Sequence, residues 1–312
     1  MATSGSTNYT VNRNRMIVMA TSAAGVGDPG QTLSSAKYAL ISDLLNMMLK
    51  SMQADGLKLW LRKQATVFLK DGTKQYSLSS TGAHATYSYT KTAIKVAAVA
   101  TDTIIDVDST TGMTAGDFVG FVLDDGTSYW TTVTSVTDSD TLVIPSPGIT
   151  SAAAISNNVY FFTTKIGRPL RILQAFIRDN NGNDTPVEII SQNDYMGLSS
   201  KDAEGQVNQI NYDPQTGSGL LNVWPKTDDV TDTLELIVQR EIEDMDAGTD
   251  DFDIPTEWYE TVLYGLTERI GIQFQIPEKM MKRITAKARE SLSKSMGFDV
   301  ENTSMFISPE IR

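Results

Sequence analysis

The glycines at residues 25–30 are the first whose spacing could serve chemistry. They match the pattern G-x-G-x-x-G, which in dinucleotide-binding proteins holds a pyrophosphate at the start of a helix. In that motif a strand runs straight into the first glycine, and an acidic residue follows about 20 positions later. Here residues 21–24 separate a candidate short strand at residues 16–19 from Gly25, and Pro29 interrupts the turn. We therefore expect no nucleotide site and no cofactor.

Cysteine and histidine, which often act as catalytic groups or metal ligands, are almost absent from the chain. The chain has no cysteine, which excludes disulfides, a thiol nucleophile and cysteine-ligated metal sites. Its single histidine, His84, lies in a stretch of Gly, Ala and Ser, where an exposed linker residue is expected. A catalytic or metal-binding role for it would need acidic partners from distant parts of the chain.

Two acidic stretches could bind calcium, but neither has the full pattern. Asp179, Asn181 and Asn183 occupy positions 1, 3 and 5 of an EF-hand loop, yet Asp184 stands where glycine is needed and no helix precedes it. The pair Asn181-Gly182 is better interpreted as a hairpin turn. The acidic run at residues 241–257 lacks the required Gly and Glu, so it is a solvated loop or an acidic face for a basic partner.

The rest of the sequence contains no motif that indicates an active site. The sequence contains no G-x-S-x-G nucleophile elbow, no GK[ST] phosphate loop and no H-E-x-x-H zinc motif. The acidic pairs belong to no recognisable hydrolase pattern. We therefore expect a structural protein, with no catalytic, cofactor-binding or metal-binding residues, rather than an enzyme.

Composition places the chain among globular proteins. It has 312 residues, 40% of them hydrophobic and 21% charged, with a net charge of -12. The acidic balance argues against sequence-wide affinity for nucleic acid, so any DNA contact is expected to be local. No apolar run reaches the ~18 residues of a membrane span, and the start does not resemble a signal peptide. Assembly in a cytoplasm is expected.

Three long helices are predicted from apolar residues at one-turn spacing. They cover residues 34–55, 253–276 and 277–297, and Pro277 separates the last two. The expected core anchors are Leu44, Trp224, Trp258 and Leu266.

The last of these helices is basic within an acidic chain. Its cations give a local net charge of +4, and those assigned to a possible interface are Lys282, Arg283, Lys287, Arg289 and Lys294. They form either a docking surface for an acidic partner or phosphates, or an ordinary charged face. Beyond the helix, the apolar residues Met305, Phe306 and Ile307 are expected to become ordered on a partner.

Between the helices the pattern predicts antiparallel hairpins, with turns at Asp71-Gly72, Asp125-Gly126 and Asn181-Gly182. Residues 83–162 contain only short strands and frequent turns, which predicts an inserted all-β barrel or sandwich anchored by Trp130. The expected fold is α+β, with a core of long helices, one N-terminal and two C-terminal, and added hairpins. The expected domains are a discontinuous one, residues 1–82 with 163–312, and the insert.

Several stretches together resemble a known family. They are ALISDLLNMMLKSMQADGLKLW (39–60), KQYSL (74–78), IGRPLRILQAFIRD (166–179), NQINYDPQTGSGLLNVWP (208–225), QREIEDM (239–245) and DIPTEWYETVLYGLTERI (253–270). They are similar to the head-to-tail adaptor proteins of short-tailed bacteriophages, also called tail accessory or packaged-DNA stabilisation proteins. The resemblance covers about three quarters of the chain and omits the first thirty residues and the insert.

The resemblance implies a virion protein that forms a ring, expected to be a dodecamer, beneath the capsid portal. Such a ring continues the DNA channel, helps to retain packaged DNA without sequence-specific binding, and offers a platform to the tail nozzle or next tail component. The basic helix and the apolar triplet would contact the portal or a neighbouring subunit. The insert is where this sequence departs from the family, and it could bind a tail fibre.

Two other functions remain open. The chain could be another phage tail or adhesive protein whose insert binds a tail fibre or a host surface glycan. It could also be an enzyme that hydrolyses envelope polysaccharide through paired carboxylates.

Overall fold

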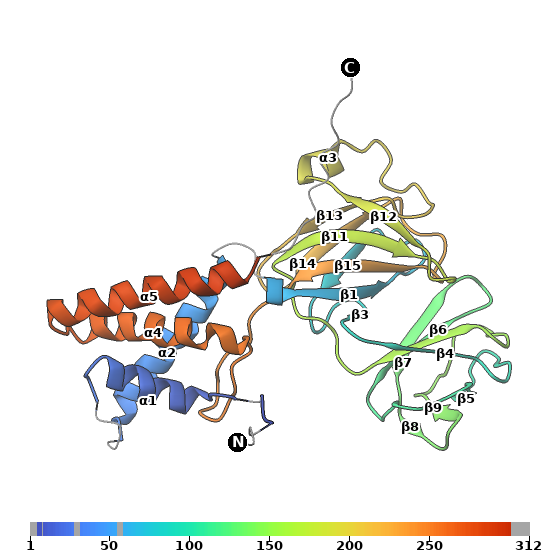
Figure 1. Cartoon of the computed structure of the whole chain (residues 1–312). Helices are drawn as coiled ribbons and strands as arrows, with labels where there is room; N and C mark the ends of the chain where they lie inside the picture. Colours follow the sequence, from blue (N-terminus) through green and yellow to red (C-terminus); the bar gives the residue numbers. More distant parts are fainter. Residues whose placement is uncertain (1–4, 8, 28–31, 55–58, 301–312) are drawn as a thin grey trace. The chain divides into compact units, whose positions relative to one another are not determined.

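A computed structural model of the chain describes residues 5–7, 9–27, 32–54 and 59–300. The contacts within the chain define two compact units. One joins residues 1–61 to residues 242–312 and is helical, and the other spans residues 62–241 and is built on β-sheets (Figure 1). The predicted boundaries of the insert, residues 83 and 162, fall inside the second unit.

The helical unit consists of segments from both ends of the chain. Its helices are α1 (Arg13–Ala23), α2 (Ser35–Ala54), η1 (Leu59–Leu61), η2 (Thr256–Trp258), α4 (Tyr259–Gln273) and α5 (Glu278–Phe298). In α4, Val262, Leu266 and Ile270 recur at one-turn spacing and are fully buried, so one side of the helix faces the core. Pro277 directly precedes α5, where its missing N–H leaves no hydrogen bond unmade.

The predictions for α2 and α5 are confirmed within one residue at each end. The helix predicted at residues 253–276 is confirmed as α4, but it starts only at Tyr259, after η2, and ends at Gln273. The short strand expected at residues 16–19 is wrong, because these residues lie in α1. Asn12 caps that helix by accepting a hydrogen bond from the Arg15 backbone N–H at 2.9 Å. Met16, Ile17 and Ala20 are buried on one face of α1, as the helical repeat requires. The apolar run at residues 16–19 is too short to distinguish a strand from a helix by itself.

The second unit contains an eight-stranded sheet in the order β2-β14-β13-β12-β11-β15-β1-β3. The strands are β1 (Arg62–Phe68), β2 (Gln75–Leu78), β3 (Ala85–Thr86), β11 (Arg171–Arg178), β12 (Asp184–Ile189), β13 (Gln209–Asp213), β14 (Gly219–Trp224) and β15 (Thr233–Gln239). The short helix α3 (Gln192–Gly197) follows β12. All neighbouring strands pair antiparallel except β12 and β13, which pair parallel over two residues.

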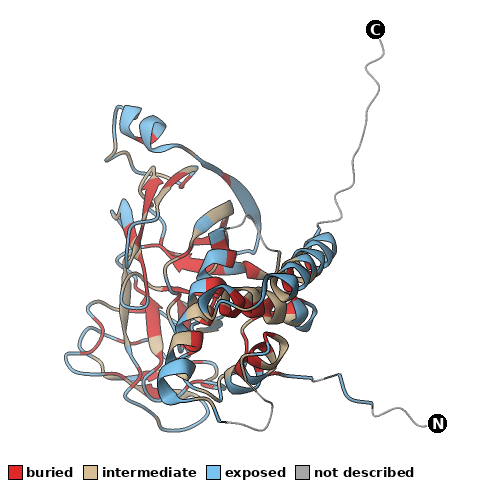
Figure 2. Ribbon diagram, turned by 90° about the vertical axis from the view of Figure 1, so that its left-hand side faces the viewer, coloured by how far each residue is buried: buried red, intermediate tan, exposed pale blue. Residues whose placement is uncertain are grey.

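The sheet curls until it is nearly closed. Its two edge strands, β2 and β3, are consecutive in the chain, and the Ala83 N–H donates to the Ser77 carbonyl at 2.7 Å between them. In β1, β11 and β15 alternate apolar residues are buried in one core, among them Val67, Leu236 and Ile177. Figure 2 shows this burial as red segments along the strands. The result is a barrel-like β core that is separate from the helical core.

The predicted fold class, α+β with a core of long helices and added hairpins, is wrong. The chain is mixed α/β, and its described part contains five α-helices and fifteen strands, with the large sheet as the main element. The reason lies in β15, which pairs along its whole length with β1 on one side and β11 on the other. The partners in these pairings lie far apart in the chain, from Arg62↔Gln239 in one to Arg178↔Thr233 in the other, so local turn patterns could not predict them.

One predicted hairpin is wrong for the same reason. Asp71-Gly72 does form a turn, with Gly72 at a φ of 64°, but β1 and β2 do not pair with each other. Strand β1 pairs with β15 and β3, whereas β2 pairs with β14. The turn therefore sends the chain to the opposite edge of the sheet.

Residues 90–162 add two smaller sheets. The four-stranded sheet has the order β4-β10-β6-β7 and the three-stranded sheet the order β5-β9-β8. Their bounds are β4 (Thr90–Ala93), β5 (Ile104–Asp106), β6 (Phe118–Val122), β7 (Ser128–Thr132), β8 (Ser135–Val136), β9 (Thr141–Val143) and β10 (Asn158–Phe162). The Asp125-Gly126 hairpin is confirmed, because β6 pairs with β7 across it. Phe121 and Ile105 lie in the buried core of this segment, and Trp130 does not.

Candidate functional site

Helix α5 has one buried and one exposed side. Ile284, Ala288, Ser291 and Ser295 lie on its buried side. The Ser295 and Thr261 hydroxyl oxygens lie 2.7 Å apart, so a buried hydrogen bond ties α5 to α4. The remaining positions of α5 are largely exposed, which leaves its cations at the surface of the helical unit.

Three of the five predicted interface cations have acidic partners. Lys282 pairs with Glu278 at 2.7 Å, and Lys294 pairs with Glu290 at 2.6 Å, both at i,i+4 spacing. Lys287 lies 3.2 Å from Glu290 and 3.5 Å from Glu260. Its hydrogen bond to Glu290 raises the pKa of Lys287, and hydrogen bonds from Lys294 and Lys287 lower the pKa of Glu290.

The other two, Arg283 and Arg289, make no ion pair within the described part of the chain, and neither does Lys279. Guanidinium groups favour planar carboxylates, which they bind through two parallel hydrogen bonds. The two arginines are therefore the strongest unoccupied anion-binding groups on α5.

A groove runs beside Arg283 between α5, α4 and the end of α1. It has a volume of about 570 Å³, and its lining residues are Ala23, Tyr264, Met280, Arg283, Ile284, Ala286, Lys287 and Glu290. The Lys287 ammonium lies 6.0 Å from the centre of the Tyr264 ring. Five of the lining residues are apolar or aromatic and three are charged, a mixture that suits a protein segment with an apolar side chain next to a carboxylate.

The other predicted site residues are spread over the molecule. Trp258 and Leu266 are fully buried in the helical core, and Leu44 packs partly buried against it. Trp224 lies in β14, half-buried, and its indole N–H donates to the Ser200 carbonyl at 2.6 Å. Met305, Phe306 and Ile307 lie outside the described residues.

The glycine-rich stretch has no nucleotide-binding geometry. Gly25 follows helix α1, whereas the dinucleotide motif follows a strand. Residues 28–31 lie outside the described residues.

His84 differs from expectation, because it is packed within an aromatic cluster. Its ring stacks on Trp130 with centroids 4.3 Å apart and planes inclined by 12°, and it meets Phe118 and Phe162 edge-on. Burial, aided by Lys165 and Lys70, lowers the pKa of His84 to about 4. Its buried Nδ1 has no hydrogen-bond partner in the described chain. No local pattern could reveal this, since Trp130 and Phe162 come from distant strands.

Glu235 is a second buried titratable group, and nothing in the sequence around it predicts its burial. It is 0% exposed in β15, and its carboxylate accepts hydrogen bonds from Gln64 and Thr66, both at 2.8 Å, and from Thr233 at 3.2 Å. Arg178 lies 3.9 Å away and also pairs with Asp184. These partners satisfy the carboxylate, so the geometry indicates a structural role.

Within the described residues, no group of three or more His, Cys, Asp or Glu side chains is placed to hold a metal ion. Nor does any helix in that part of the chain combine the length and apolarity needed to cross a membrane. No family model matches the chain, and a comparison with curated proteins finds no relative.

Proposed function

We propose that the chain is a structural virion protein whose copies form a ring between the capsid portal of a short-tailed phage and the next tail component. The observation that carries the proposal is α5, a helix whose exposed side bears six basic residues against two acidic ones in a chain of net charge -12. The sequence resemblance supports the same function. The proposal assigns no catalytic residue.

The charge asymmetry indicates which surface of the chain would contact an acidic partner. Most of the chain repels an acidic partner, whereas α5 attracts one, so electrostatics favour docking through this helix. The groove beside Arg283 supplies apolar area for the same contact. An acidic balance elsewhere suits a channel through which DNA passes without adhering. The ring, a dodecamer in this proposal, would present the tail nozzle with a platform and keep packaged DNA in place.

The test is to mix the purified chain with portal rings from the same genome and to examine negatively stained particles. A collar with the symmetry of the portal supports the proposal, whereas a chain that stays separate contradicts it. A double substitution, Arg283→Glu with Arg289→Glu, should weaken portal binding at least tenfold, because it reverses two cations that have no acidic partner on α5.

A matched control reverses two exposed cations elsewhere in the helical unit, Arg15→Glu with Lys37→Glu. This control changes net charge by the same amount and should bind portal rings normally. Equal losses in both variants would show that net charge, rather than α5, drives association.

A second function is favoured by one observation on the insert. Four large apolar residues on residues 94–155 are more than half exposed, namely Val96, Val99, Ile104 and Ile155. Exposed apolar side chains of this kind suit contact with another protein or a host surface, as in a tail or adhesive protein. Polar replacement of all four should then abolish fibre or cell binding while portal binding persists. Unchanged fibre and cell binding would remove this candidate.

A further inference from the structure

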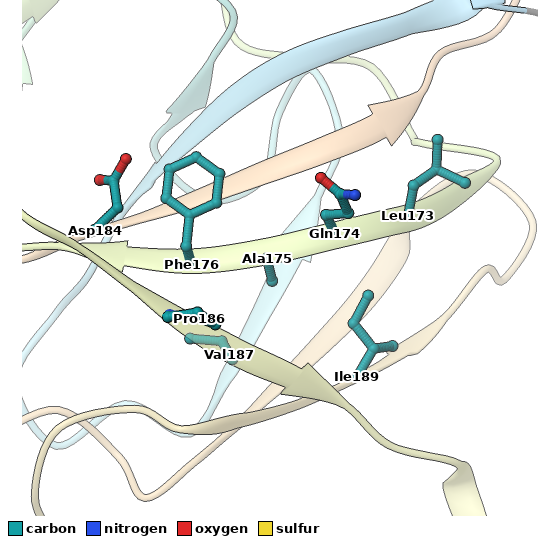
Figure 3. Close-up of a pocket in the computed structure, with 8 residues that line it drawn as sticks. All are labelled: Leu173, Gln174, Ala175, Phe176, Asp184, Pro186, Val187 and Ile189. Carbon is teal, nitrogen blue, oxygen red and sulfur yellow. The ribbon is translucent and has the colours of Figure 1, made fainter. Parts of the chain in front are cut away.

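The large sheet contains a slot where two neighbouring strands separate. Strands β11 and β12 pair from Arg178↔Asp184 only as far as Ala175↔Val187. Beyond that point β12 turns to β13, with which Glu188 and Ile189 pair. Residues 171–174 of β11 therefore pair with β15 on one side and, in the described chain, with no strand on the other. Figure 3 shows the two strands close at Phe176 and Pro186 and apart at Leu173 and Ile189.

The backbone on both walls of this slot is open to a new strand. The N–H groups of Glu188 and Ile190 donate to β13, or to the residue before it, at 2.9 and 2.8 Å. In a strand the N–H and C=O groups of successive residues point to opposite sides. Those of Ile189, which lies between Glu188 and Ile190, therefore face β11. On the opposite wall a β-bulge at Leu173 interrupts the pairing of β11 with β15. Because residues 171–174 pair with no described strand on this side, an extended segment placed here could form a ladder with β11 and with Ile189 of β12.

The side chains of the slot are mainly apolar. It has a volume of about 510 Å³, and its lining residues are Leu173, Gln174, Ala175, Phe176, Asp184, Pro186, Val187 and Ile189. The only carboxylate among them, Asp184, is held by Arg178 at 2.8 and 2.9 Å. Ile189 is 40% exposed although it lines the slot. Arg171, at the open end of β11, is exposed and makes no ion pair in the described chain.

One segment of this chain has the matching chemistry. Residues 304–308, Ser-Met-Phe-Ile-Ser, put three large apolar residues between two small polar ones, and Pro309 follows them. In an extended strand Met305 and Ile307 point to one face of the sheet and Phe306 to the other, so each face receives an apolar side chain. Glu310 follows closely and carries the charge opposite to Arg171.

We propose that residues 304–308 of a second copy of this chain add to the slot between β11 and β12 as a short strand. The proposal rests on the proposed ring, in which each copy meets the next through the same pair of surfaces. Strand addition joins neighbours through backbone hydrogen bonds, and the apolar pockets set the register. It assigns the apolar triplet to the contact between subunits and leaves α5 to the portal.

The absence of cysteine from the chain makes a cross-linking test clean. Two singly substituted full-length chains, Ile189→Cys and Phe306→Cys, are mixed and treated with a short bismaleimide. The expected product is a covalent dimer that contains one chain of each kind. Adding Met305→Asp and Ile307→Asp to the Phe306→Cys chain should reduce the dimer at least tenfold, because charged side chains would enter an apolar slot.

The control pairs the Phe306→Cys chain with a Val99→Cys chain. Val99, on the insert, is 62% exposed against 40% for Ile189, so a cysteine there should react at least as readily as one at position 189. Equal cross-linking with this control would overturn the proposal, since it would indicate random encounter. A chain that carries both substitutions, Ile189→Cys and Phe306→Cys, and links only within itself on dilution would show that a copy fills its own slot, which also contradicts the proposal.

The mixture is treated both alone and on portal rings, so that the two proposals can fail separately. No heterodimer under either condition overturns strand addition. If the chain does not bind portal rings, the adaptor function fails. The cross-linking of the chains alone then still shows whether residues 304–308 add to the slot.

Discussion

At the scale of single residues, His84 couples the packing of the aromatic cluster to pH. The pKa of His84 is about 4 in the folded chain against an ordinary value of 6.5, because burial disfavours the charged ring. The unfolded chain therefore takes up the proton first as pH falls. The stabilisation is complete above about pH 6.5 and is lost progressively down to about pH 4.

We predict that His84→Phe removes this part of the pH dependence. The phenyl ring can keep the stack on Trp130, and the buried Nδ1 has no partner to lose. Between pH 7 and pH 4.5 the wild-type chain should lose about 2 kcal/mol more unfolding free energy than the variant, after allowance for the part of the ring that is exposed. Urea unfolding followed by tryptophan fluorescence measures this. Identical losses in both chains would show that carboxylates alone control the pH response.

Glu235 gives a second prediction at this scale. Glu235→Ala should lower the unfolding free energy by about 2–4 kcal/mol, because three hydrogen-bond donors and Arg178 lose a buried acceptor. Asp184→Asn, which breaks the more exposed contact of the same arginine, should cost less than about 1 kcal/mol. Chemical denaturation of both variants provides the comparison. A Glu235→Ala chain as stable as Asp184→Asn would show that the buried network contributes little.

At the scale of elements, the central strand β6 depends on one glycine. A Cβ atom at Gly120 would lie well inside van der Waals contact with the indole of Trp130 on β7. Glycine at this position therefore lets the tryptophan lie flat across the strand. It also keeps Trp130 in contact with His84, Phe68 and Phe162.

We predict that Gly120→Ala destabilises the unit of residues 62–241 by about 1–3 kcal/mol, because Trp130 must move. The tryptophan emission should shift to longer wavelength as that ring becomes more exposed. Gly167→Ala is the control, since a Cβ there meets nothing within 4 Å. An unshifted spectrum with normal stability would mean that the indole has another equally good position.

At the scale of the whole molecule, the division into two units predicts which fragments fold. Residues 62–241 form one continuous segment with its own buried cores, so this fragment should unfold cooperatively by itself. Residues 1–61 alone should not fold, because α1 and α2 complete their core with Trp258, Val262 and Leu266 from the other end of the chain. Circular dichroism with thermal unfolding tests both fragments. A cooperative transition for residues 1–61 would contradict this assignment.

The sequence by itself determined features that depend on neighbouring residues. Helices α2, α4 and α5 follow from apolar residues at one-turn spacing, and Pro255 and Pro277 mark where the last two begin. The turns at Gly126 and Gly182 follow from glycines in left-handed conformations. The cations of α5 were identified because charge asymmetry is visible in composition.

Only the tertiary structure decided how distant segments combine. The pairing of β15 with both β1 and β11 replaced the expected helical core by a large sheet, and no local signal specifies such a partner. The same applies to the stack of His84 on Trp130, the burial of Glu235 and the slot between β11 and β12. Each depends on which strands become neighbours, and that choice is made by the burial of the whole sheet rather than by any one segment.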